Sequence, residues 1–185
     1  MKRFALSAVM ACLLLALCAC GAPEAPKTPA APDDTASGST DAPAENAGIL
    51  SAFTADTLDG EQVDQTLFAE DTLTMVNVWG TSCGPCISEM PDLAELAEEY
   101  EDKNVRIIGL VADVLDSDGQ FSETQLETAR DVVASTGADY VHLLPSPDLQ
   151  GLLAQISSLP TTFFVNSAGA QVGTAYLGAK DKEDW

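Results

Sequence analysis

Two cysteines separated by two residues stand between an apolar segment and a long amphipathic segment, and this arrangement constrains the fold more than any other feature. Residues 75–79 (MVNVW) are apolar apart from Asn77, which favours a strand covered on both faces. Glycine and proline then indicate a turn over residues 80–85, and apolar residues recur at helical spacing over residues 87–100. The sequence therefore predicts Cys83 at the N-terminus of a helix, directly after a strand, which is typical of a redox-active dithiol.

The predicted position of Cys83 matters because only the thiolate form of cysteine attacks a disulfide. A free cysteine ionises near pKa 8.5, and lowering the pKa to about 7 requires about 2 kcal/mol. The N–H groups and dipole of a helix N-terminus supply about 0.3–2 kcal/mol. Most of the shift therefore needs no neighbouring cation, and residues 73–102 contain no Lys or Arg. Cys83 is the predicted nucleophile, and Cys86, one turn inside the helix, is the predicted resolving thiol.

The N-terminal residues have the pattern of a targeting signal. Two basic residues precede an apolar run over residues 4–17, which is too short for a mature membrane span. Residues 17–20 (LCAC) match a bacterial lipobox. We therefore expect a lipoprotein signal peptide at residues 1–19 and a lipid on Cys20, which would anchor the chain durably. The alternative is an ordinary cleaved signal peptide that leaves Cys20 free.

The segment after the lipobox is of low complexity. Residues 20–48 are rich in Ala, Pro, Ser and Thr and cannot bury enough apolar surface to fold, so we expect a disordered tether there and a globular domain at residues 49–185. The two cysteines that precede Cys20 leave with the signal peptide, so Cys83 and Cys86 alone remain in the domain. An exported domain with one closely spaced cysteine pair favours a catalytic dithiol over a structural staple.

The chain is strongly acidic, with a formal net charge of −21. Removing the two basic residues of the signal peptide leaves 6 basic and 29 acidic residues, or −23. Such a charge excludes a nucleic-acid partner and disfavours direct contact with anionic lipid head groups. We expect a monomer with a solvated acidic surface, located outside the cytoplasm and held at the bacterial cell membrane by its lipid anchor.

The rest of the domain alternates between strand and helix patterns. A hairpin about an Asp-Gly turn is predicted within residues 51–67. Strands are predicted at residues 73–79, 105–111, 140–144, 161–165 and 171–176. A helix capped by Ser122 is predicted to end at Gly137, and a shorter one begins at Ser146–Pro147. A closing helix would be expected about residue 185, where the sequence stops. The C-terminal helix is therefore predicted to be missing or truncated.

Three stretches of the domain carry a family resemblance: VNVWGTSCGPC at residues 76–86, Glu-Met-Pro at residues 89–91 and LPTTFF at residues 159–164. Over residues 52–178 the chain resembles the TlpA/ResA-like, thioredoxin-fold extracytoplasmic thiol–disulfide oxidoreductases. The resemblance implies an α/β thioredoxin-like fold with an N-terminal β-hairpin and an inserted strand–helix within residues 114–138.

The resemblance also implies how substrate is held. Pro160 matches the proline that the family holds in cis, facing the two cysteines, where it would expose the backbone of Leu159 and Thr161 to an extended substrate segment. The alternative for Pro160 is a trans proline on an edge strand. Trp79 and the residues between the cysteines complete the expected substrate-contacting set: Trp79, Gly84, Pro85, Leu159 and Thr161.

Glu89 is the remaining catalytic candidate. It lies three residues after Cys86, so both point from the same helical face, and the TlpA/ResA branch keeps a partly buried glutamate there to move the proton of the resolving thiol. The alternative is an exposed glutamate that only favours the helix dipole. Asn77 replaces the buried acid of cytoplasmic thioredoxins, which shifts weight onto Glu89, and Ser82 replaces a common tryptophan.

Metal and cofactor sites are not expected. The aspartates at residues 113–119 lack the spacing of a calcium loop. His142 is the only histidine and lies in a strand pattern, and Cys83 with Cys86 would supply only two of four zinc ligands. The redox-active group is expected to be the Cys83–Cys86 disulfide itself.

The predicted function is therefore that of a membrane-anchored thiol–disulfide oxidoreductase, and the Gly-Pro pair between the cysteines favours a reductase. The resemblance implies exported protein disulfides or oxidised partner enzymes as substrates, such as methionine sulfoxide reductase, a peroxidase or apocytochrome c, and a membrane electron donor. Two alternatives remain open: a disulfide-forming oxidase, and a binding module in which the dithiol is idle.

Overall fold

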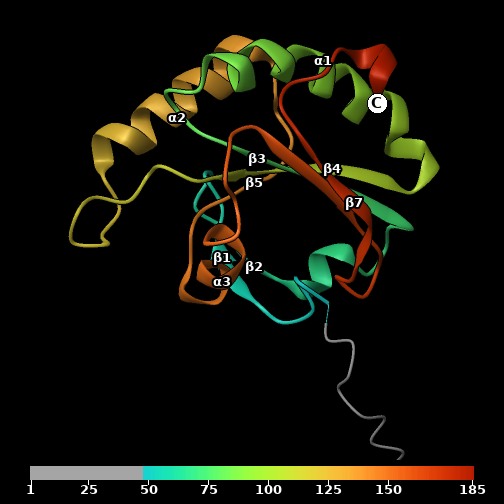
Figure 1. Ribbon diagram of the computed structural model, residues 1–185, viewed down its shortest axis with the longest axis horizontal. Coiled ribbons are helices and arrows are strands. Elements are labelled where there is room, and N and C mark those ends of the chain that lie inside the picture. Colours follow the sequence, from blue (N-terminus) through green and yellow to red (C-terminus); the bar gives the residue numbers. More distant parts are fainter. Residues whose placement is uncertain (1–47) are drawn as a thin grey trace, which may run out of the picture. The chain divides into compact units, whose positions relative to one another are not determined.

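The computed structural model describes residues 48–185, which fold around a five-stranded mixed β-sheet (Figure 1). The predicted signal peptide, the lipid on Cys20 and the tether up to residue 47 lie outside the described residues. Within the described part of the chain, no helix is both long enough and apolar enough to cross a membrane.

The sheet has the strand order β5-β4-β3-β6-β7. Its strands are β3 (Leu73–Trp79), β4 (Val105–Val111), β5 (His142–Leu143), β6 (Thr161–Val165) and β7 (Gln171–Leu177). The first three run parallel to one another, β6 is antiparallel to β3, and β7 is antiparallel to β6. β3 is central and apolar because both of its faces are covered.

Helices and a hairpin cover the two faces of the sheet (Figure 1). One face carries α1 (Gly84–Tyr100), η2 (Glu101–Lys103), α2 (Glu123–Thr136) and the C-terminal η4 (Lys182–Asp184). The other carries the hairpin of β1 (Thr54–Asp56) and β2 (Gln62–Asp64), with η1 (Gln65–Phe68), η3 (Pro147–Leu149) and α3 (Gln150–Leu153). The architecture is a three-layer α/β fold with the central strand buried on both sides.

Alternation along β3 divides its side chains between two cores. Val76 and Val78 pack into the core on the hairpin side, with Phe68 of η1. Trp79 and Met75 face α1 and pack into the clusters that include its buried side chains. Successive side chains of a strand point to opposite faces of the sheet, which produces this division. The carboxyl end of β3 is therefore packed from both sides.

The parallel pairing of β3 with β4 determines where the dithiol lies. Trp79 pairs with Val111 at the carboxyl ends of the two strands. The segments that follow, residues 80–83 and 112–113, therefore leave the sheet at the same edge. This edge is where open α/β sheets bind their ligands.

Most local predictions are confirmed. β3, β4 and β6 have the predicted bounds, and the hairpin of β1 and β2 turns at the Asp-Gly pair. The backbone N–H of Gln125 donates to Ser122 Oγ (3.4 Å) at the start of α2, and Gly137 ends this helix with a left-handed φ of 70°.

Three elements differ from the prediction. The inserted segment contributes α2, but its strand is reduced to an isolated bridge between Leu115 and Phe121. β5 has only two residues. The helix after Ser146 begins as the 3-10 helix η3 and continues as the short α3. After β7, the described residues form η4, which packs along α1 through Lys182.

A substitution of Gly109 in β4 tests the packing of the core between the sheet and α1. A Cβ at this position would collide with the buried His142 ring and lie 2.9 Å from Trp79 Nε1. Because both rings are buried and bonded to each other, neither can move freely. We expect Gly109→Ala to lower the free energy of unfolding by about 1–3 kcal/mol, measured by urea denaturation.

Gly151 of α3 provides the matched control. A Cβ at Gly151 would meet no atom within 4 Å, and alanine favours helix over glycine. Gly151→Ala should leave the free energy of unfolding unchanged or raise it by up to about 1 kcal/mol. Equal effects of the two substitutions would contradict the packing described for Gly109.

Candidate active site

The two cysteines lie at the N-terminus of α1, as predicted. Cys83 is the N-cap residue, in an extended conformation, and is joined to Cys86 by a disulfide. Cys83 is half-buried, whereas Cys86 is completely buried. The backbone N–H of Cys86 donates to Cys83 Sγ (3.2 Å). The sulfur of Cys83 thus occupies the place where the unpaired N–H groups of a helix favour negative charge.

The turn that presents Cys83 is tied to the neighbouring strand. Cys83 N–H donates to Gly80 O (3.1 Å), and Ala112 N–H donates to Trp79 O (2.8 Å). Asp113 accepts two hydrogen bonds from Thr81, one from its backbone N–H and one from its hydroxyl, each 2.9 Å long. These contacts connect the end of β3 to the end of β4 immediately before the dithiol.

Pro160 follows a cis peptide bond, as the resemblance implies. Its side chain is buried, and its carbonyl oxygen accepts a hydrogen bond from Gly178 N–H (2.9 Å). Leu159 is half-buried and packs, together with Cys83, against the apolar cluster that contains Trp79 and Cys86. The proline loop and the dithiol therefore share one apolar base.

Glu89 is buried, with 3 % of its surface exposed, so the alternative of an exposed helix-start glutamate is wrong. Its Oε1 accepts a hydrogen bond from Asn77 Nδ2 (2.7 Å), and its Oε2 accepts one from Lys180 N–H (3.0 Å). Asn77 Nδ2 also donates to Thr162 Oγ1 (2.9 Å). The carboxyl group is thus held by β3 and by the segment that follows β7.

Burial raises the pKa of Glu89 above its ordinary value, and the nearby Asp92 carboxylate acts in the same direction. The hydrogen bonds from Lys180 N–H and Asn77 favour the ionised form and oppose the rise. Glu89 lies one turn beyond Cys86 on the helix. A carboxyl group with a raised pKa in this position is suited to hold and release a proton at a higher pH than an exposed glutamate.

Trp79 requires a correction. It was predicted to contact substrate, but its side chain is completely buried, and its Nε1–H donates to His142 Nδ1 (3.1 Å). His142 Nε2–H in turn donates to Ala138 O (2.9 Å), and because Nδ1 accepts from Trp79, the ring is neutral. Burial lowers the pKa of His142 in keeping with this. Both ring nitrogens are occupied by protein groups. Trp79 and His142 support the floor of the site and do not face a ligand.

Thr161 also requires a correction. Only 3 % of the surface of the whole residue is exposed, and its hydroxyl donates to Ser158 O (2.7 Å). Its backbone pairs with Val78 on one side and Leu177 on the other. It therefore lies inside the sheet. Gly84 and Pro85 are exposed at the helix start and remain, with Leu159, the predicted substrate-contacting residues.

Two contributors to the site were missed from the sequence. Asp113 follows β4 at the carboxyl edge, beside the turn that precedes Cys83, and the parallel strand pattern was the signal that could have located it. Lys180 contributes its backbone N–H to Glu89. A main-chain donor leaves no residue-type signal, so the sequence offers no means to find it.

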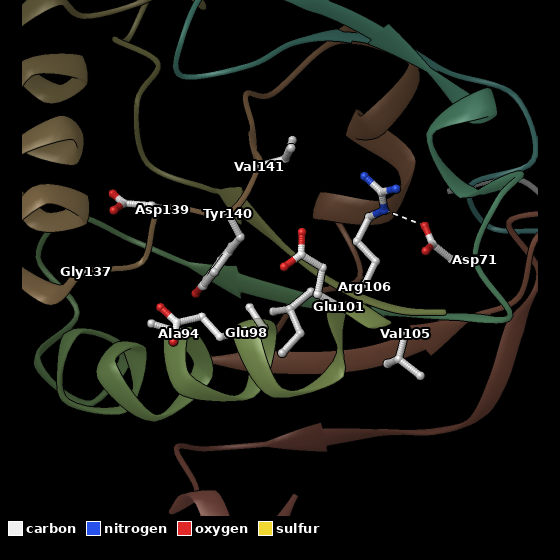
Figure 2. Close-up of a pocket in the computed structure, with 12 residues that line it drawn as sticks. Asp71, Ala94, Glu98, Glu101, Val105, Arg106, Gly137, Asp139, Tyr140 and Val141 are labelled. Carbon is white, nitrogen blue, oxygen red and sulfur yellow. Dashed lines mark hydrogen bonds and ion pairs between the residues drawn. The ribbon is translucent and has the colours of Figure 1, made fainter. Parts of the chain in front are cut away.

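A pocket of about 390 Å³ lies apart from the dithiol, between α1, the start of β4 and residues 137–141 (Figure 2). Its polar lining includes Glu98, Glu101 and Asp139, and Arg106 pairs there with Asp71. None of the lining residues belongs to the dithiol site. Over residues 48–185, no group of three or more potential metal ligands converges, in this pocket or elsewhere.

Comparison with known proteins identifies chains that are similar in sequence. The AhpC/TSA family profile matches residues 49–170. The protein named thiol-disulfide oxidoreductase ResA of Bacillus thuringiensis subsp. konkukian (strain 97-27) is 28% identical over 117 residues, which cover 63% of this chain and 61% of ResA. Thioredoxin-like protein YneN of Bacillus subtilis (strain 168) is 28% identical over 134 residues, or 71% of each chain. The chain thus spans about three fifths of the length of the ResA proteins that it matches.

Solved structures share the fold. A thiol:disulfide interchange protein of the thioredoxin family from Chlorobium tepidum TLS has a TM-score of 0.59 at 22% identity, covering 77% of this chain and 93% of that one. StoA from Bacillus subtilis has a TM-score of 0.55 at 19% identity, covering 72% and 92%. The predicted thioredoxin-like fold is confirmed by these similarities.

Proposed function

The chain belongs to the AhpC/TSA family, and from this membership and the geometry of its dithiol we propose that it is a thiol–disulfide oxidoreductase. The observation that carries the proposal is the contrast between the two sulfurs. Cys83 caps α1 and is partly accessible, while Cys86 is completely buried behind it. One thiol can meet a substrate, and the other can meet only Cys83.

The reaction exchanges two electrons and two protons. The Cys83 thiolate attacks one sulfur of a substrate disulfide, and the other substrate sulfur leaves as a thiolate and is protonated. The Cys86 thiolate then attacks Cys83 Sγ, which releases the second substrate sulfur and forms the Cys83–Cys86 disulfide. The substrate is reduced and the protein is oxidised, and an external donor must reduce Cys83–Cys86 again.

We propose the reductase direction, with exported protein disulfides, oxidised partner enzymes or apocytochrome c as substrates and a membrane electron donor that restores the dithiol. The Gly-Pro pair between the cysteines supports this direction by resemblance. The relative ResA is named a thiol-disulfide oxidoreductase, which is consistent with disulfide exchange as the chemistry. A reduction potential well above about −150 mV would instead favour the oxidase.

Stoichiometric reduction of insulin tests the proposal. The full chain is reduced, freed of reductant and mixed with insulin, and the state of Cys83 and Cys86 is followed by peptide mass spectrometry. We expect one insulin disulfide to be reduced for each Cys83–Cys86 disulfide that forms. Insulin that stays oxidised while both thiols persist would overturn the reductase proposal and leave the oxidase and the binding module.

We further propose that the protein acts outside the cytoplasm, anchored by a lipid on Cys20. The lipobox at residues 17–20 supports this location. Because several acyl chains contribute about 0.8 kcal/mol per buried CH₂, Cys20→Ser should move the protein from the membrane fraction to the soluble fraction, measured by fractionation of cells. Continued membrane partitioning of Cys20→Ser would contradict the anchor.

A further inference from the structure

Asp113 is the acidic side chain most directly connected to the turn that carries Cys83. Its Oδ1 accepts from Thr81 N–H and its Oδ2 from the Thr81 hydroxyl, so both carboxylate oxygens are engaged with one residue. Oδ2 would also lie 3.0 Å from a Cβ at Gly80. The carboxylate therefore packs directly on the backbone that leads to the dithiol.

The turn transmits this contact to Cys83. Cys83 N–H donates to Gly80 O (3.1 Å), so residues 80–83 form one hydrogen-bonded unit. Asp113 is fixed from the other side as well, because its own carbonyl oxygen accepts a hydrogen bond from Gln125 Nε2 (3.5 Å) of α2. The position of the N-cap sulfur thus depends on a carboxylate that is itself held by a second helix.

The charge of Asp113 is not neutralised by a salt bridge. Each ion pair found within residues 48–185 uses Lys103, Arg106 or Lys182, and none of them includes Asp113. Asp113 is half-buried and bonded to the turn that ends at Cys83, and a negative charge in that position opposes formation of the thiolate. This effect acts against the helix N-terminus, which favours the thiolate.

We propose that Asp113 is a positioning residue for Cys83, which holds the turn before the nucleophile through Thr81 and limits ionisation of Cys83 through its own charge. This inference deepens the proposed function and rests on it. The other titratable or charged groups on the elements packed around the dithiol include Glu89 and Asp92 of α1, Arg130 of α2, and Tyr140, His142 and Lys180. All of the charged groups on these elements stay unchanged in the variants below.

The pH dependence of Cys83 alkylation separates charge from position. The full chain is reduced and treated with iodoacetamide at a series of pH values, and the Cys83 peptide alone is quantified by mass spectrometry. Asp113→Asn keeps an acceptor for Thr81 N–H and a donor for the Thr81 hydroxyl but removes the charge. We expect the midpoint of the profile to move down by about half a pH unit, which makes alkylation roughly threefold faster below the midpoint.

Asp113→Ala removes both hydrogen bonds and tests positioning. Insulin reduction by Asp113→Ala should fall at least about fivefold below that of Asp113→Asn at a pH above both midpoints, where ionisation no longer differs. Circular dichroism establishes that each variant is folded. If Asp113→Ala does not fold, the Asp113→Asn profile still decides the charge effect.

Asp116→Asn is the matched control, because Asp116 makes the same kind of carboxylate contact but only within its own loop, to the N–H groups of Asp118 and Gln120. The midpoint of Cys83 alkylation in Asp116→Asn should stay at the wild-type value. A midpoint in Asp113→Asn that equals the control, or lies above it, would overturn the inference. Alkylation needs no substrate disulfide, so a shifted profile in a chain that cannot reduce insulin would reject the proposed function alone.

Discussion

Cys83→Ser is expected to abolish reduction of insulin by the full chain while leaving the fold intact. Cys83 is the partly accessible sulfur at the N-cap of α1, and serine cannot form a thiolate. Removing a nucleophile typically costs several orders of magnitude in rate, so we expect a loss of at least about 1,000-fold, down to the background of the assay. The measurement is the turbidity of insulin under limiting dithiothreitol.

Cys86→Ser is the matched partner of this variant, because both variants lose the same disulfide and differ only in the thiol that remains. Cys86 is completely buried, so its loss should spare the first attack and block release. We expect Cys86→Ser to accumulate a mixed disulfide between Cys83 and its substrate, visible on a non-reducing gel. The reverse outcome, capture by Cys83→Ser only, would exchange the predicted roles of the two cysteines.

The dithiol could be located from the sequence because its signals are local. The apolar strand, the turn and the helical spacing of residues 87–100 all lie within one short stretch, and the structure has β3 and α1 where they were predicted. The same holds for α2, whose first and last residues are set by Ser122 and Gly137. Capping and periodicity depend on neighbours in sequence, so they can be read without tertiary information.

The surroundings of Glu89 could not be predicted in this way. Its two hydrogen-bond donors come from Asn77, 12 residues away, and from the backbone of Lys180, 91 residues away. Trp79 was misassigned for a related reason. Its direction is set by the alternation along β3, but its partner His142 lies on β5, which has only two residues and a weak sequence pattern.

These long-range contacts converge on the segment that follows β7. Gly178 N–H bonds to Pro160 O, Lys180 N–H to Glu89, and Lys182 N–H to Asp92 Oδ2 (3.0 Å). One stretch of backbone thus joins the proline loop to the acidic face of α1. The segment after β7 therefore contacts both the predicted substrate-contacting loop and the predicted proton carrier.

Glu89→Gln is expected to slow disulfide exchange and to change its pH dependence. Burial raises the pKa of Glu89, so the carboxyl group exchanges protons closer to neutral pH than an exposed glutamate does. Glutamine fills the same space but cannot take the proton of the Cys86 thiol. General acid–base groups typically contribute about 10²- to 10⁴-fold, so we expect a fall of at least about 100-fold in single-turnover oxidation by insulin, measured from pH 4 to pH 8.

Glu98→Gln is the control, since it makes the same chemical change at an exposed position of the same helix. Its rate and profile should match the wild type. A Glu89→Gln profile that keeps the wild-type shape would remove Glu89 from proton transfer and leave it a structural role.

The pH dependence of the free energy of unfolding gives a second test of Glu89, and the direction of the expected change follows from the direction of its pKa shift. Because its pKa is higher in the folded state than in the unfolded state, the folded state binds more protons between the two values. The wild type should therefore gain stability relative to Glu89→Gln as the pH falls through that window, from the raised pKa down to the ordinary carboxyl pKa of about 4.5. Urea denaturation at pH 7 and pH 5 measures the difference. The quantity compared is the free energy of unfolding of the wild type minus that of Glu89→Gln. If this value falls from pH 7 to pH 5, the buried carboxyl group is held ionised by Asn77 and Lys180. Such a group could not accept the proton of Cys86.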